Sequence, residues 1–262
     1  MDLNLSGKVA VVTGASKGIG LAITRSLAAE GVSVAAGARG GSDELSELAV
    51  RSAVHPVLVD LTTPEGPTRL VEEATRTFGG LDILVNNVGA VRPRLEGFLA
   101  LTDDDWDWAL SINFLAAVRT TRAALPHLLD RAPATIVTVS SVNAFLPDPA
   151  VIDYSAAKGA LTNFCKSLSK EFGPRGVRVN TVSPGPVETD LWFGDDGVAA
   201  TVARTKHGHP EEVAKQAVAE ASTGRFTHPR EVADLVLLLV SDRAGNVTGT
   251  DVLIDGGLVK TL

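Results

Sequence analysis

The sequence contains little cysteine and no long apolar run. Cys165 is the single cysteine of the 262 residues, which excludes an internal disulfide and a zinc site built from several cysteines. His207 and His209 are the one histidine pair close in sequence. They lie where we expect neither strand nor helix to fix a ligand geometry, so we predict no metal site. No window approaches the roughly 20 apolar residues that cross a bilayer.

Clusters of basic residues are also missing. The chain carries 24 lysines and arginines against 31 aspartates and glutamates, a formal net charge of −7. A surface that follows nucleic-acid phosphates needs clustered positive charge, so we predict neither nucleic acid nor a membrane as partner. Residues 1–7 are polar and lead directly into an apolar segment, so we expect no signal peptide and a cytoplasmic location.

The sequence does contain two kinds of alternating segment. Short apolar, β-branched segments predict strands at 9–12, 32–35, 56–59, 83–85, 136–139, 178–182 and 251–254. Apolar residues at helical spacing predict helices at 18–30, 70–78, 102–131, 153–172 and 232–240. Uniformly apolar strands are buried on both faces. We therefore predict an α/β fold, a single Rossmann-type domain over 1–262 whose doubly wound parallel sheet has about seven strands and helices on both faces.

One stretch, 190–226, breaks the alternation. It is polar, contains four glycines and has room for short helices only. A segment of this length within a compact domain is usually a lid or a binding loop, and we predict a substrate lid.

A glycine-rich segment follows the first predicted strand and opens the first predicted helix. Glycines there allow a sharp turn and let a pyrophosphate approach the amide groups of the helix N-terminus. The spacing differs from G-x-G-x-x-G, so a turn without a ligand remains an alternative. The candidate residues are Gly14, Ser16, Lys17, Gly18, Ile19 and Gly20.

A tyrosine and a lysine, Tyr154 and Lys158, stand four residues apart on a predicted helix and so project from the same face. A free phenol titrates near pH ~10, and a neighbouring cation lowers that pKa. Such a tyrosine can exchange a proton with a carbonyl or alcohol oxygen. An ordinary exposed helical face is the alternative.

Together the two motifs resemble the short-chain dehydrogenase/reductase family, and the resemblance extends over 8–257. It implies a catalytic set of Asn113, Ser141, Tyr154 and Lys158, with Ser141 thirteen residues before the tyrosine. Val88 departs from the family's usual alanine. The tail 255–257 also matches. Further cofactor contacts that the resemblance implies are Asp60, Leu61, Asn87, Val88, Gly89, Tyr154, Lys158, Pro184, Gly185, Val187 and Thr189.

The resemblance also implies a mechanism. In the reducing direction a hydride passes from nicotinamide to a carbonyl carbon while Tyr154 protonates the oxygen and Ser141 hydrogen-bonds to it. Lys158 is expected to lower the pKa of Tyr154 and to hold the nicotinamide ribose. Asn113 is expected to anchor a water that returns the proton.

The residues at the end of the second predicted strand indicate which cofactor is preferred. NAD-preferring members place an acid there, whereas this chain has Ala38 followed by Arg39. Arg39 and Lys17 can meet a 2′-phosphate, so we predict NADP(H). If both are solvated loop charges, NAD(H) and an NAD-dependent alcohol dehydrogenase are the alternative.

The remaining predictions concern the substrate and its surroundings. Trp192 and Phe193 either line the substrate cavity or pack within the loop. The family resemblance implies that Phe145, Leu146 and Asp148 form one wall of that cavity. We expect Arg92 and Arg94 to be exposed charges, with contact to an anionic substrate as the alternative. The expected partner is a small carbonyl or alcohol compound, and family resemblance implies a homotetramer or dimer. A dinucleotide-binding protein without catalysis is a further alternative.

Overall fold

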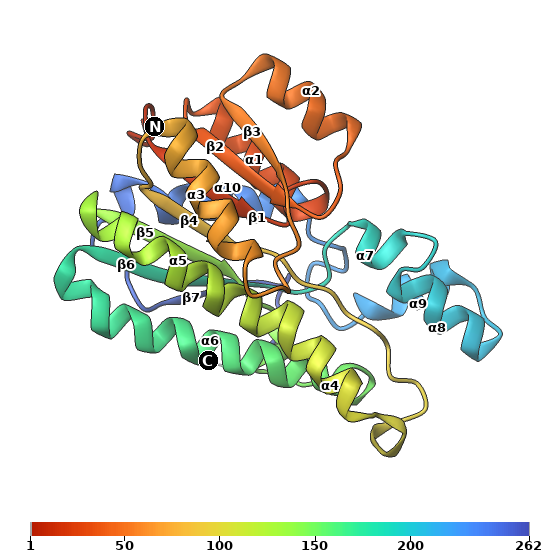
Figure 1. Cartoon of the computed structure of the whole chain (residues 1–262). Coiled ribbons are helices and arrows are strands. Elements are labelled where there is room, and N and C mark those ends of the chain that lie inside the picture. The colour runs from red at the N-terminus through yellow and green to blue at the C-terminus, as the bar shows by residue number, and fades with distance from the viewer. Residues whose placement is uncertain (1, 262) are drawn as a thin grey trace.

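A single seven-stranded sheet organises the chain in the computed structural model, which describes residues 2–261 (Figure 1). All neighbouring strands are parallel, in the order β3-β2-β1-β4-β5-β6-β7. Val11 in the centre lies opposite Ala35 of β2 and Leu84 of β4, and all three are buried. The strands are β1 (Val9–Thr13), β2 (Ser33–Ala38), β3 (Val54–Leu58), β4 (Ile83–Asn86), β5 (Ala134–Val139), β6 (Val177–Pro184) and β7 (Asp251–Ile254).

Helices cover both faces of this sheet, and each face has its own apolar core. One face is covered by α1 (Gly18–Ala29), α2 (Asp43–Arg51) and α10 (Pro229–Val240). The other is covered by α3 (Gly66–Phe78), α5 (Ala116–Asp130) and α6 (Ile152–Phe172). The predicted doubly wound α/β fold is confirmed. Cys165 is buried in the second core, as a small apolar residue would be.

Two helical predictions needed correction. Helix α2 was not predicted, although Ser42 is a good N-cap residue and its hydroxyl accepts a hydrogen bond from the Leu45 amide. The predicted helix over 102–131 is interrupted. It consists of α4 (Asp103–Leu110), a π-helical turn at Ser111–Leu115, and α5. Turns of the π type are rare and are frequently found at functional sites.

The stretch 190–226 stands beyond the carboxyl edge of the sheet, where Figure 1 shows its helices projecting from the body. It contains three short helices, α7 (Asp190–Phe193), α8 (Val198–Lys206) and α9 (Pro210–Ala217). Phe226 packs against both Trp192 and Phe193, with ring centroids 5.3 and 4.9 Å apart. Within residues 2–261, no helix has the length and apolar character required to traverse a bilayer.

Candidate active site

The loops that follow the strands meet at the carboxyl edge of the sheet, where the strand order reverses between β1 and β4. Ligands of open α/β sheets bind at such a point. Two adjoining hollows lie there. One, of about 440 Å³, follows the glycine-rich loop and is called the glycine groove below. The other, of about 510 Å³, surrounds Tyr154 and is called the tyrosine cavity. Both are lined by Ile19, Asn87, Gly89, Thr189 and Leu191.

Most of the residues predicted to bind a dinucleotide line one hollow or the other. Pro184, Gly185, Val187, Tyr154 and Lys158 line the tyrosine cavity. The glycine groove is lined by Gly14, Ser16, Lys17, Gly18, Ile19, Arg39, Asp60, Leu61, Asn87, Val88, Gly89 and Thr189. Sequence segments far apart in the chain are thus brought to one site.

Glycine is required in this loop for two different reasons. Gly14 has a φ of +66°, in the left-handed region that favours glycine. Gly20 lines neither hollow, and its contact with the cofactor remains a prediction. A Cβ on Gly20 would lie 2.1 Å from the Gly14 carbonyl oxygen, so this glycine allows α1 to pack closely on the loop.

The floor of the glycine groove is held by a residue that was not predicted, Thr13 at the end of β1. Its hydroxyl oxygen accepts hydrogen bonds from the amides of Asn87 at 2.8 Å and Val88 at 3.0 Å. The Asn87 side chain in turn donates to the Thr13 carbonyl at 2.9 Å. These bonds fix the loop after β4 against the glycine-rich loop. The one sequence signal for this role of Thr13 is its position at the end of a strand.

The outer end of the glycine groove carries the charged candidates. Ala38 is buried, whereas Arg39 is exposed and faces Asp60. The pKa of Asp60 is held below its usual value mainly by hydrogen bonds from Thr62, with a smaller contribution from Arg39. Lys17 forms an exposed ion pair with Asp190 of α7, with Nζ and Oδ2 3.7 Å apart. Exposed pairs of this kind are weak and break readily.

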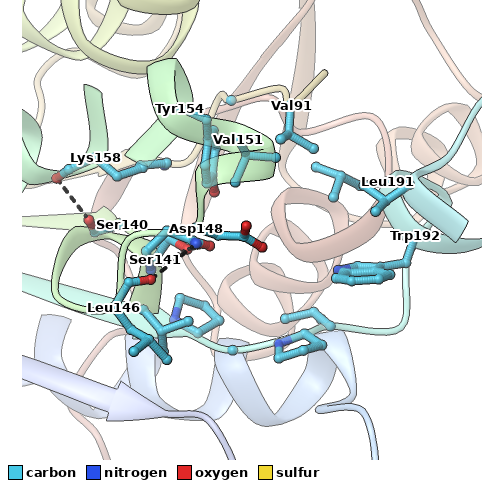
Figure 2. A pocket seen from close by; sticks show the side chains of 18 of the residues that line it. Val91, Ser140, Ser141, Leu146, Asp148, Val151, Tyr154, Lys158, Leu191 and Trp192 are labelled. Atoms are coloured by element: carbon cyan, nitrogen blue, oxygen red, sulfur yellow. Dashed lines mark hydrogen bonds between the residues drawn. The ribbon is translucent and has the colours of Figure 1, made fainter. Parts of the chain in front are cut away.

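The tyrosine cavity collects the predicted catalytic side chains (Figure 2). Tyr154 and Lys158 come from α6, and Ser141 follows β5. In Figure 2 the Tyr154 hydroxyl points into the space that Ser141 faces. Lys158 is 3% exposed, and its Nζ donates to the Val139 carbonyl at 2.9 Å. The neighbouring Ser140 does not join this set, because its hydroxyl pairs with that of Thr162 at 2.7 Å.

The expected direction of the Tyr154 pKa is wrong for this structure. Burial raises the pKa of the phenol above 10.0, and a hydrogen bond with Ser141 opposes that rise. The Lys158 Nζ lies over the tyrosine ring, 5.7 Å from its centre. Burial also lowers the pKa of Lys158 itself, from 10.5 to about 8. Desolvation is therefore the largest effect on the pKa of both groups.

Asn113 lies near these residues but outside both hollows. It is 1% exposed in the π-helical turn, and its side chain bonds both the amide of Ala90, at 3.0 Å, and its carbonyl, at 2.9 Å. A Cβ on Gly89 would lie 3.0 Å from the Asn113 Oδ1 and 3.6 Å from the Lys158 Nζ. Asn113 thus holds the loop after β4 next to Lys158, and its water-anchoring role remains a prediction.

The prediction for Arg94 is also wrong, because this residue is not an exposed charge. Its side chain is 11% exposed and its guanidinium donates to Asp153 at 2.6 Å and to Asp105 at 2.8 Å. The Asp153 Oδ1 accepts from the Tyr154 amide at 2.9 Å, so the network reaches the first turn of α6. Burial works to lower the pKa of Arg94, but the two carboxylates raise it overall.

Arg92 and residues of the stretch 190–226 complete the surroundings. The Arg92 guanidinium lies 3.8 Å from the centre of the Trp108 ring, a cation–π contact. Trp192 lines the tyrosine cavity, whereas Phe193 packs on Phe226. Val91, Val198, Ala217 and Leu258 also line the cavity, and no sequence pattern indicated them. Among the described residues no group of three His, Cys, Asp or Glu side chains could hold a metal ion.

Comparisons with known proteins agree with this geometry. The family model described as Enoyl-(Acyl carrier protein) reductase matches residues 14–259. The 3-oxoacyl-(acyl-carrier-protein) reductase of Thermotoga maritima is 33% identical over 261 residues, covering 98% of this chain and 100% of that protein. The corresponding reductase of Aquifex aeolicus is 35% identical over 263 residues, covering 98% of this chain and 100% of that protein.

Solved structures give the same result. L-sorbose reductase from Gluconobacter frateurii, complexed with NADPH and L-sorbose, superposes with a TM-score of 0.91 at 34% identity. That match covers 100% of both chains. A dehydrogenase/reductase from Sinorhizobium meliloti gives a TM-score of 0.85 at 32% identity, covering 98% of this chain and 97% of the other. The chain therefore belongs to the short-chain dehydrogenase/reductase family, oxidoreductases that act on CH–OH and C=O groups with NAD(P).

Proposed function

We propose that this protein uses NADPH to reduce the ketone group of a small molecule to a secondary alcohol. The observation that carries the proposal is the junction of the two hollows. Tyr154, Ser141 and Lys158 line the cavity that adjoins the glycine groove, and both share Asn87 and Gly89. The groove residues fit a dinucleotide, because Gly14 and Gly18 both adopt positive φ and leave room for a pyrophosphate at the N-terminus of α1.

Each residue of the cavity has a distinct role in this proposal. NADPH supplies the hydride when it is bound. Tyr154 donates its proton to the substrate oxygen, and its raised pKa keeps the phenol protonated at neutral pH. Ser141 donates a hydrogen bond to that oxygen and stabilises the negative charge that develops there. Lys158 holds the nicotinamide ribose from the back of the cavity, and Asn113 keeps the loop at Gly89 in place.

Preference for NADPH rests on the end of β2. Ala38 places no carboxylate there, and Arg39 lines the groove with a planar guanidinium that can bind a 2′-phosphate. Lys17 lies on the same groove and can exchange its weak pair with Asp190 for the phosphate. The NADPH bound to L-sorbose reductase supports this choice. An NAD-dependent alcohol dehydrogenase is the competing proposal.

Titration with NADPH and NADH, followed by nicotinamide fluorescence, tests the cofactor. We expect NADPH to bind more tightly, and Arg39→Ala to weaken NADPH binding by about tenfold or more, as loss of one charge-assisted hydrogen bond predicts. NADH binding should change little. Arg92→Ala is the matched control, since Arg92 lies on Trp108 and not in the groove. An equal loss of affinity for both cofactors in Arg39→Ala, or no loss of affinity for NADPH, would favour the NAD-dependent alternative.

A dinucleotide-binding protein without catalysis makes a different prediction. It would bind NADPH, yet no ketone would oxidise it, and Tyr154→Phe would alter nothing measurable. The presence of Ser141, Tyr154 and Lys158 in one cavity argues for catalysis.

A further inference from the structure

The tyrosine cavity has an apolar wall with one carboxylate in it. Val91, Leu146, Val151, Leu191 and Trp192 line the cavity, and Figure 2 shows the Asp148 carboxylate pointing into the space between them. Among the cavity-lining residues that the structure describes, Asp148 and Lys158 are the two with charged side chains. Lys158 is at the back, bonded to the Val139 carbonyl, so the accessible charge is negative.

The local structure explains how Asp148 is held. Its Oδ1 accepts a hydrogen bond from the Ala150 amide at 2.8 Å, which caps the short 3-10 helix at Pro149–Val151. Its own amide donates to the Ser155 hydroxyl at 3.3 Å. One carboxylate oxygen is thus fixed by the backbone, and the carboxylate has capacity left for a donor from the cavity.

The charges around the cavity disfavour an anionic substrate. A carboxylate or phosphate on the substrate would face Asp148. Arg94, the cation considered above for such a group, is already paired with Asp105 and Asp153. The alternative in which Arg94 binds an anion therefore has no support in the structure.

We infer that Asp148 is a specificity residue, and that the preferred substrate is a ketone with a mainly apolar body and a hydrogen-bond donor away from the carbonyl. A protonated amine is the strongest such donor and a hydroxyl a weaker one. This inference rests on the proposed ketone reduction. Asp148 is exposed on the cavity wall, so a donor on the substrate gains a charge-assisted hydrogen bond that an analogue without the donor cannot make.

Three matched ketones test the inference: acetophenones with an aminomethyl, hydroxymethyl or ethyl group, each in the 3- and 4-substituted form. The groups are similar in size and differ in the donor. For the better-placed isomer we expect kcat/KM to be about fivefold higher for aminomethyl than for ethyl, the upper end for an ion pair with an exposed carboxylate. The hydroxymethyl compound should fall between them.

Asp148→Asn is the informative variant. Asparagine still offers an oxygen to the Ala150 amide, so the cap is kept, but it presents an NH₂ donor to the cavity. The preference for aminomethyl over ethyl should disappear, so that the ratio of the two kcat/KM values falls to about one. Asp195→Asn removes an exposed charge of the lid that does not line the cavity, and should leave the preference unchanged.

The outcomes are separable. Equal kcat/KM for the three groups in the unmodified protein, or an unchanged preference in Asp148→Asn, would overturn the role of Asp148. An equal loss of the preference for aminomethyl in Asp195→Asn would also overturn this role. The preference would then depend on the net charge of the protein and not on the carboxylate in the cavity. Turnover of none of the ketones, despite tight NADPH binding, would contradict the proposed function itself.

Discussion

The glycine groove and the tyrosine cavity adjoin each other but are built in different ways. The groove is formed by backbone at strand ends, held by the hydrogen bonds of Thr13 and Asn87, and its charged residues Lys17 and Arg39 are exposed. The cavity is formed by side chains from distant segments, and its polar group Lys158 is almost fully buried. The groove is suited to bind a ligand through fixed amides. The cavity is suited to chemistry, because buried groups have shifted pKa values.

The largest expected effect comes from removing Arg94, which supports the tyrosine cavity but does not line the glycine groove. Arg94→Ala leaves Asp153, whose side chain is 2% exposed, as a buried charge without its partner. Removing one member of a buried pair costs about 3–5 kcal/mol, so the free energy of unfolding in urea should fall by that order. Binding of NADPH by the folded variant should change little, since Arg94 does not line the groove. Arg92→Ala should lower the free energy of unfolding much less. A similar loss in both variants would contradict the importance of the ion pairs around Arg94.

A stabilising change should come from Lys158. The fall of its pKa from 10.5 to about 8 corresponds to about 3 kcal/mol at about 1.36 kcal/mol per pH unit. Lys158→Met removes this penalty, so at pH 7 the variant should be more stable by up to about that amount and inactive.

The pH dependence of this difference has a definite sign. Below pH 8 the lysine is charged in both the folded and the unfolded state, and the full penalty applies. Between pH 8 and 10.5 the unfolded state binds more protons, so the stability of the unmodified protein rises towards that of the variant. Urea unfolding at pH 7 and pH 9.5 measures this, and a difference that grows with pH would contradict the burial argument.

The smallest effect concerns the tyrosine pKa. Tyr154 is the only tyrosine of the chain, so the ultraviolet absorbance of phenolate reports on this residue alone. In the protein without cofactor its pKa should lie above 10.0, because burial dominates. Ser141→Ala should raise it further, since the Ser141 hydrogen bond lowers it. A pKa below 10.0 would restore the expectation that Lys158 controls the phenol.

The difference between the two hollows also explains what could be predicted from the sequence. Backbone sites at strand ends leave a local pattern, and Gly14 was predicted from its position after the first strand. Asn87 and Gly89 were predicted from the family resemblance, and all three residues line the glycine groove. The same holds for the α/β alternation, because burial on both faces leaves uniformly apolar strands. Tyr154 and Lys158 followed from helical spacing.

The rest depends on tertiary contacts that no local pattern encodes. The burial of Arg94, which lies in a loop, depends on Asp105 of α4 and Asp153 of α6. The direction of the Tyr154 pKa depends on desolvation, which sequence neighbours do not reveal. Ala217 and Leu258 reach the cavity from segments far along the chain. The single-domain boundaries, the oligomer and the location in the cell remain predictions.

The central claim, that Tyr154 protonates a ketone reduced by NADPH, is tested most directly by following NADPH absorbance with 3-ethylacetophenone in the unmodified protein and in Tyr154→Phe. Loss of a general acid costs about 10²–10⁴ in rate, so we predict a fall of kcat by at least about 100-fold with NADPH binding unchanged. Equal rates in the two proteins would contradict the account, because the proton would then come from another group.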